Sequence, residues 1–102
     1  MKSIVIAAAA TALVAMSGVV SADQKLAQKH ACMSCHQVSK KVVGPAFTDV
    51  AKKYKGDAGA EAHLLGVIKK GGKGVWGNVP MPPHPQVSEA DAKSIVTWVL
   101  GL

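Results

Sequence analysis

Five consecutive residues, Cys32-Met33-Ser34-Cys35-His36, constrain this chain more than any other part of its sequence. Residues three apart on a helical turn share a face, so the two thiols can reach the two vinyl groups of one porphyrin. His36 follows directly, which places its imidazole beneath the ring, where it can bind the iron. The C-x-x-C-H spacing therefore predicts one haem c, covalently attached through Cys32 and Cys35.

The first 22 residues have the pattern of a secretory signal peptide. Lys2 precedes an apolar run over residues 4–20, and Val20-Ser21-Ala22 provides small residues at a cleavage site. We expect cleavage after Ala22, which leaves residues 23–102 as one monohaem domain in the periplasm, an oxidising compartment. The alternative is an uncleaved membrane anchor, but the run is short and weakly hydrophobic for a membrane span. No stable membrane insertion is expected after cleavage.

Residues 23–102 form too small a domain to build a large apolar core, and they hold only four aromatic side chains. A Cys32–Cys35 disulfide would close a very short loop and stabilise little, whereas a haem would supply a large apolar body. Two other uses of the cysteines are alternatives. An exported thiol-disulfide oxidoreductase would use Cys32 and Cys35, but the βαβ pattern is missing. A zinc module would need tetrahedral ligands, for which adjacent Cys35 and His36 are poorly spaced.

The domain is basic. The whole chain has a formal charge of +6, and residues 23–102 contain no arginine, so their positive charge comes from lysine. An exported chain without a basic helix interleaved with aromatic residues is not expected to bind nucleic acid. Most of the lysines are expected to form a solvated surface. Those near the haem edge would steer docking onto acidic partners; the candidates are Lys40, Lys41, Lys69, Lys70 and Lys73.

Four helical segments and no strands are predicted. The first runs from about Asp23 into the region of Cys32, and Pro45 suits the first position of the second, which ends at Gly56. The third ends where Lys69-Lys70 meets Gly71-Gly72, and the last begins at the capping-box pattern Ser88-Glu89-Ala90-Asp91. The apolar faces of the last three are Phe47, Val50, Ala51 and Tyr54; Ala60, Leu64, Val67 and Ile68; and Ala92, Ile95, Val96, Val99 and Leu100.

Met81 lies in a proline-rich stretch, residues 71–87, that cannot be regular helix. Met1 and Met16 lie in the signal, and Met33 lies inside the attachment segment. Met81 is therefore the one methionine able to act as sixth iron ligand. Its rival is His84, because haems with two histidine ligands exist, whereas His30 and His63 are expected to be ordinary exposed residues. A methionine ligand would favour ferrous iron and close the second axial position, which favours electron transfer over catalysis.

These residues together resemble the small bacterial class I c-type cytochromes, most closely the cytochrome c-551 type. The likeness extends from the helix before Cys32 to Leu102 and rests on C-x-x-C-H, Val43-Gly44-Pro45-Ala46, Gly74-Val75-Trp76-Gly77 and Pro80-Met81-Pro82-Pro83. It implies an all-α fold of four to five short helices around one covalently bound haem. It also implies that His36 and Met81 bind the iron, that the Pro45 carbonyl orients His36, and that the Trp76 indole reaches a haem propionate. The first and last helices would cross near Leu26 and Trp98.

The resemblance further implies a soluble, monomeric electron carrier, not an enzyme, that passes single electrons between respiratory redox proteins. The expected donor is a membrane cytochrome complex. The expected acceptor is a nitrite reductase, a cytochrome c peroxidase or a terminal oxidase. Two residues depart from the family pattern: His84 stands where relatives often have an asparagine that can contact the ligand sulfur, and Val67 stands where some have a basic residue near a propionate. Both departures bear on the reduction potential and its pH dependence.

Overall fold

The computed structural model describes residues 21–102, so all but the end of the predicted signal segment, residues 1–22, lies outside the described part. The elements are α1 (Ala22–Lys29), the 3-10 turn η1 (Cys32–Ser34), α2 (Phe47–Lys53), α3 (Ala60–Lys70) and α4 (Glu89–Leu100). Within residues 21–102 there is no strand, and two isolated β-bridges are the only extended pairings. The prediction of an all-α fold is confirmed.

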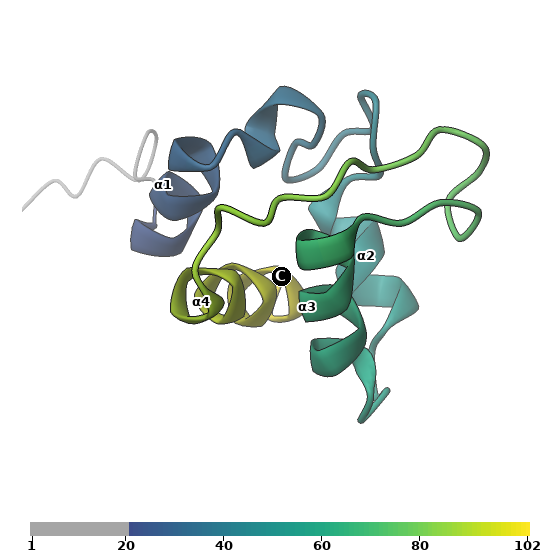
Figure 1. Cartoon of the computed structure of the whole chain (residues 1–102). Helices are drawn as coiled ribbons and strands as arrows, with labels where there is room; N and C mark the ends of the chain where they lie inside the picture. The colour runs from purple at the N-terminus through teal and green to yellow at the C-terminus, as the bar shows by residue number, and fades with distance from the viewer. Residues whose placement is uncertain (1–20) are drawn as a thin grey trace, which may run out of the picture.

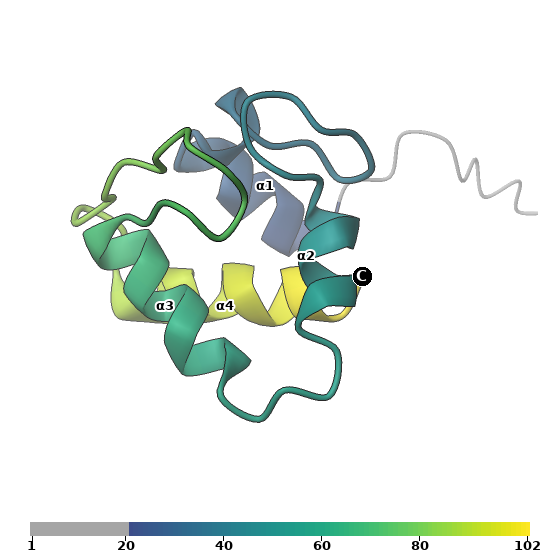
Figure 2. The ribbon, with the colours of Figure 1, turned by 90° about the vertical axis from the view of Figure 1, so that its right-hand side faces the viewer.

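Helix α4 is the centre of the packing. It contacts α1, α2 and α3. It lies below α1 in Figures 1 and 2, and α3 crosses it in Figure 2. Its buried face consists of Ala92, Ile95, Val96 and Val99, four of the five residues in the predicted stripe, and the fifth, Leu100, is half-buried. Ser88 caps its start, since the Ser88 hydroxyl accepts a hydrogen bond from the amide of Asp91 at 3.1 Å.

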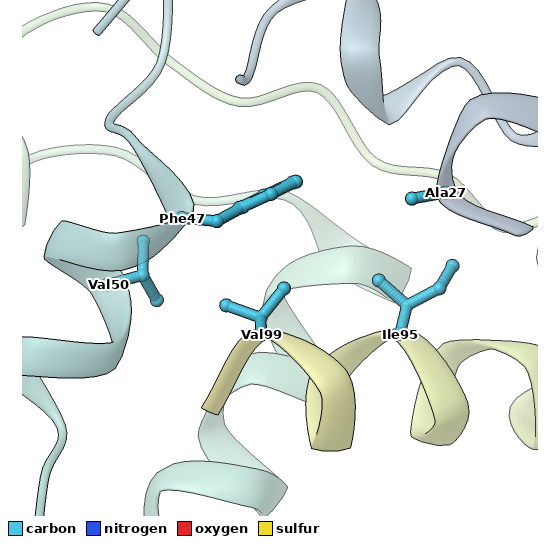
Figure 3. Packing of buried hydrophobic residues seen from close by; sticks show 5 residues of the cluster. All are labelled: Ala27, Phe47, Val50, Ile95 and Val99. Atoms are coloured by element: carbon cyan, nitrogen blue, oxygen red, sulfur yellow. The ribbon is translucent and has the colours of Figure 1, made fainter. Parts of the chain in front are cut away.

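Two apolar clusters pack on α4. The first contains Ala27, Phe47, Val50, Ile95 and Val99, and it joins α1 and α2 to α4 (Figure 3). Leu26 and Trp98 pack against this cluster, and the Trp98 ring meets Phe47 edge-on with centroids 5.5 Å apart. The second cluster contains Ile68, Val87, Ala92 and Val96, and it joins α3 to α4. The predicted core role of Trp98 therefore agrees with its position.

Three helix boundaries differ from the prediction, and one of them is the end of α2, which lies at Lys53 instead of Gly56. Helix α1 ends at Lys29 instead of running to Cys32, because Ala31 adopts a left-handed conformation with φ of 63° and breaks the helix before η1. Helix α2 begins at Phe47, so Pro45 lies outside it. The amide of Phe47 donates to the carbonyl of Gln37, and this long-range bond sets the start of the helix.

The expectation that His30 is an ordinary exposed residue is wrong. Its side chain is only 13% exposed, and its Nε2 lies 2.9 Å from Oδ2 of Asp91. The end of α1 packs on the start of α4, which brings these two side chains together. The Asp91 carboxylate thus joins two helices, while the amide of the same residue completes the Ser88 cap.

Two long connections, residues 35–46 and 71–87, pass over the same side of α4 (Figures 1 and 2). The second begins at Gly71, which has φ of 79° and lies so close to Met81 that an added Cβ would be 2.6 Å from its carbonyl oxygen. Only glycine combines that conformation with that approach. The tight start of this connection brings Met81 back alongside the end of α3.

Candidate functional site

The imidazole of His36 is held by two neighbours. Its Nδ1 lies 2.8 Å from the carbonyl oxygen of Pro45, and its ring stacks on Phe47 with centroids 4.8 Å apart and planes 20° apart. A carbonyl oxygen only accepts, so Nδ1 carries the proton and Nε2 keeps a free lone pair. Gly44 leaves room for this arrangement, because an added Cβ would be 2.5 Å from Cε1 of the ring. In this orientation His36 could bind a metal through Nε2.

The two cysteines lie at the ends of η1 and form no disulfide. The amides of Cys35 and His36 both donate to the carbonyl of Cys32, at 3.2 and 3.0 Å, so the motif is one compact turn. Burial raises the pKa of the Cys32 thiol above its usual value of 9.0, and a backbone hydrogen bond offsets only part of this rise. A dithiol redox enzyme needs a thiol with a lowered pKa, so this thiol is poorly suited to that chemistry.

Met81 is fixed by its backbone. Its amide donates to the carbonyl of Gly72 at 2.7 Å, and the amide of Gly72 donates to the carbonyl of Met81 at 3.1 Å. The side chain is half-buried and packs against the cluster of Ile68 and Val87. His36, by contrast, stacks on Phe47 of the other cluster. The two candidate axial ligands, His36 and Met81, therefore pack against different apolar clusters.

One cavity of about 650 Å³ brings all the predicted site residues together. Its lining includes the six residues singled out from the sequence: Cys32, Cys35, His36, Pro45, Trp76 and Met81. Its walls come from α2, α3, α4 and both long connections. This volume is within the range of about 300–1,000 Å³ typical of sites for small molecules and cofactors.

Other cavity residues were not assigned from the sequence. Tyr54 and His63 both line the cavity, and their rings face each other at a tilt with centroids 5.6 Å apart. The pKa of Tyr54 is raised, first by burial and then by the negative charge of Asp57. His63 is exposed as expected, yet its spacing of four residues from Val67 is a signal that could have placed it on the cavity face of α3.

The Trp76 ring is 41% exposed and lies at the cavity with a cation beside it. The Nζ atom of Lys53 is 5.6 Å from the ring centroid, which is within range of a cation–π contact. Lys53 extends from the last turn of α2, whereas Trp76 belongs to the 71–87 connection. The contact therefore holds this connection against α2 at the cavity.

The donor groups around the cavity match a covalently held haem. They include two thiols for attachment, the His36 imidazole with a free Nε2, and the Met81 thioether on another wall. The lack of a side chain at Gly44 is required for this orientation of the imidazole. Among residues 21–102 no group of three His, Cys, Asp or Glu side chains could hold a metal ion, so the zinc alternative has no site in this part of the chain. The residues fit haem c.

Comparison with known proteins shows the family of this chain. The sequence profile of the family "Cytochrome c" matches residues 21–102. Cytochrome c-552 of Hydrogenobacter thermophilus is 50% identical over 91 residues, covering 89% of this chain and 92% of that protein. Cytochrome c-551 of Allochromatium vinosum is 54% identical over 81 residues, covering 79% and 86%. The crystal structure of wild-type Nitrosomonas europaea cytochrome c552 is 52% identical, with a TM-score of 0.74 over 76% of this chain and 96% of that one.

The chain belongs to the cytochrome c family and has the class I cytochrome c fold. Within that family its relatives are the small bacterial cytochromes c-551 and c-552. The family carries one covalently bound haem c, and Cys32 and Cys35 have the spacing of its attachment motif. The protein is an electron carrier and not an enzyme, which excludes the thiol-disulfide oxidoreductase alternative.

Proposed function

We propose that this cytochrome is a periplasmic carrier whose single haem c is attached through Cys32 and Cys35 and ligated by His36 and Met81. The observation that carries the proposal is one cavity lined by both cysteines, an imidazole oriented through its Nδ1, and Met81 on another wall. Bound haem would supply an iron that alternates between ferric and ferrous states. The export signal over residues 1–22 supports a periplasmic location.

The protein's part in electron transfer is to hold both ligands still. Pro45 fixes the ring of His36, and the paired hydrogen bonds with Gly72 fix the backbone of Met81. If His36 and Met81 both bound the iron, no position would be left for oxygen or a substrate. The thioether favours ferrous iron and raises the reduction potential. Trp76 would donate its indole N–H to a haem propionate from the 71–87 connection.

The docking surface would be the exposed rim of the cavity. It holds four exposed apolar side chains, with exposed fractions of 48% to 63%: Val42, Val43, Val75 and Val79. Lys41 and Lys73 line the same cavity, whereas Lys69 is drawn toward Glu89 at 3.9 Å. An apolar patch with two lysines beside it suits brief docking with acidic redox proteins. We propose a membrane cytochrome complex as donor, and a nitrite reductase, a cytochrome c peroxidase or a terminal oxidase as acceptor.

None of the helices within residues 21–102 is long and apolar enough to cross a membrane.

The first experiment is to express the full chain in a bacterium that matures c-type cytochromes and to measure the visible spectrum and intact mass of the periplasmic product. We expect the mass of residues 23–102 plus one haem. Absence of a haem adduct, under conditions that load other cytochromes, would refute the proposal. A product that retains residues 1–22 would refute the cleavage step alone.

The sixth ligand is tested by the weak near-infrared charge-transfer band of methionine-ligated ferric haem. We expect the band in the unsubstituted protein, its loss in Met81→Ala and its retention in His84→Ala. The opposite result would assign the ligand to His84. Both variants truncate a side chain on the same connection, so each serves as the control for the other.

A further inference from the structure

His84 has a ring nitrogen that the structure leaves unused. Its Nδ1 is buried and has no hydrogen-bond partner among the described residues. The backbone on either side is well anchored, since the amide of His84 donates to the carbonyl of Ile68 at 2.7 Å and its carbonyl accepts from Val87 at 3.1 Å. A buried polar atom without a partner destabilises the folded state. A histidine held this firmly, with a ring atom unsatisfied, calls for a partner outside the protein's own hydrogen bonds.

The ring lies where an iron ligand would be useful. His84 lines the same cavity as His36 and Met81, and it follows Met81 by three residues along one connection. Pro82 and Pro83 lie between them, and their fixed φ angles restrict the backbone that joins the two residues. An imidazole is the commonest metal ligand in proteins. One wall of the cavity therefore carries two donor groups, a thioether and an imidazole.

The two donors differ in the oxidation state that they favour. A thioether favours ferrous iron, so the affinity of Met81 for the iron, compared with that of an imidazole, is lowest in the ferric protein. Met81 holds its place through the pair of hydrogen bonds with Gly72. Local opening of such a pair costs less than unfolding the whole domain. The hydrogen bond from the amide of His84 to the carbonyl of Ile68 is separate from this pair, so it can persist when the pair opens.

We propose that His84 is a reserve iron ligand, which binds ferric haem iron when the thioether of Met81 leaves it. The exchange breaks the iron–sulfur bond and forms an iron–nitrogen bond, with no change in oxidation state. It keeps the iron six-coordinate and closed to small ligands during opening of the connection. The inference rests on the proposed ligation by His36 and Met81.

The test uses haem-loaded Met81→Ala protein at pH 7.5, where most lysines are protonated. We expect a ferric spectrum that is low-spin and has an electron paramagnetic resonance signal of two imidazole ligands. The double variant Met81→Ala/His84→Asn should become high-spin. Added cyanide should bind the double variant at least tenfold more tightly than the single variant, because no internal ligand competes. His63→Asn in place of His84→Asn is the matched control, since His63 also lines the cavity, and it should leave the low-spin spectrum unchanged.

A high-spin spectrum in Met81→Ala, or an unchanged low-spin spectrum in the double variant, would overturn the proposal. Far-UV circular dichroism checks that each variant is folded. An unsubstituted protein gives a second measurement that needs no change at Met81. In urea below the main unfolding transition, it should lose the methionine band while staying low-spin, whereas His84→Asn should become high-spin at the same urea concentration. Absence of the methionine band without urea would instead refute the proposed Met81 ligation, so the two failures are distinguishable.

Discussion

Gly44 matters because it has no side chain. Its position beside the imidazole of His36 leaves no space for a methyl group, since an added Cβ would be 2.5 Å from the ring. Gly44→Ala should therefore displace the ring from the Pro45 carbonyl and lower the free energy of unfolding by about 1–3 kcal/mol, as overpacking does. Urea unfolding of the haem-loaded protein gives the stability, and the His36 ring signals in the nuclear magnetic resonance spectrum report the displacement.

Gly66 provides the matched control for that change. It lies inside α3, and an added Cβ there would meet no atom within 4 Å. Gly66→Ala should raise the free energy of unfolding by about 0.5–1 kcal/mol, because alanine is the better helix former. If the two substitutions had the same effect, the close approach at Gly44 would have no energetic importance.

Tyr54 gives the domain a dependence on alkaline pH. Its pKa is raised above 10.0 by burial and by Asp57, so the folded state holds the phenolic proton more tightly than the unfolded chain. The contribution of protonated Tyr54 to the free energy of unfolding is complete below the pKa that this residue has in the unfolded chain. It is lost as the pH rises from there through the pKa of Tyr54 in the folded state. Relative to Tyr54→Phe, the natural protein should lose stability above about pH 10. Urea unfolding of both proteins from pH 8 to 11.5 measures this difference, and parallel curves would contradict it.

Among the helices, α4 and α1 are joined by a polar contact inside an otherwise apolar interface. His30 and Asp91 are 2.9 Å apart and largely screened from solvent on the His30 side. His30→Ala should lower the free energy of unfolding at pH 7 by about 1–2 kcal/mol, since the Asp91 carboxylate loses its partner. A double-mutant cycle with Asp91→Asn should give a coupling of about 0.5–3 kcal/mol. Strictly additive effects would show that the contact contributes nothing.

Lys69 and Glu89 offer a comparison for this cycle, because they join α3 to α4 at 3.9 Å with side chains 42% and 79% exposed. Glu89→Gln should change the free energy of unfolding by less than about 1 kcal/mol, as expected for a solvated ion pair. A larger effect at His30–Asp91 than at Lys69–Glu89 would separate a contact that stabilises the packing of two helices from a surface ion pair that contributes little.

Helix positions were predictable because each apolar stripe has a helical period, and the caps at Ser88 and Gly71 are local signals. The end of α1 and the start of α2 were not, because distant residues decide them. The amide of Phe47 bonds to Gln37, and the burial of His30 depends on Asp91. A single sequence shows neither partner. For the same reason Met81 could be chosen by elimination, whereas the ring pair of Tyr54 and His63 could not be foreseen.

For the molecule as a whole, the cavity separates parts of one small core. Phe47 and Val50 of the first cluster line it, and so do Ile68 and Val96 of the second. Within residues 21–102, α1, α2 and α3 therefore pack on one another only through α4, and α2 and α3 also face the cavity of about 650 Å³. Haem would complete the core as well as carry the electron, so folding and cofactor attachment are linked.

The double variant Cys32→Ser/Cys35→Ser tests that link, because it removes both attachment points with little change in volume. At about 24 cal/mol per Å³, leaving only a third of the cavity empty would cost about 5 kcal/mol, which is comparable with the whole stability of a small domain. We expect the variant, isolated without haem, to lose its helical circular dichroism and its cooperative urea transition. Cys35→Ser alone keeps one attachment point, so its helical content and stability should lie between those of the unsubstituted protein and those of the double variant. A cooperative transition in the haem-free double variant would show that the four helices support the fold unaided.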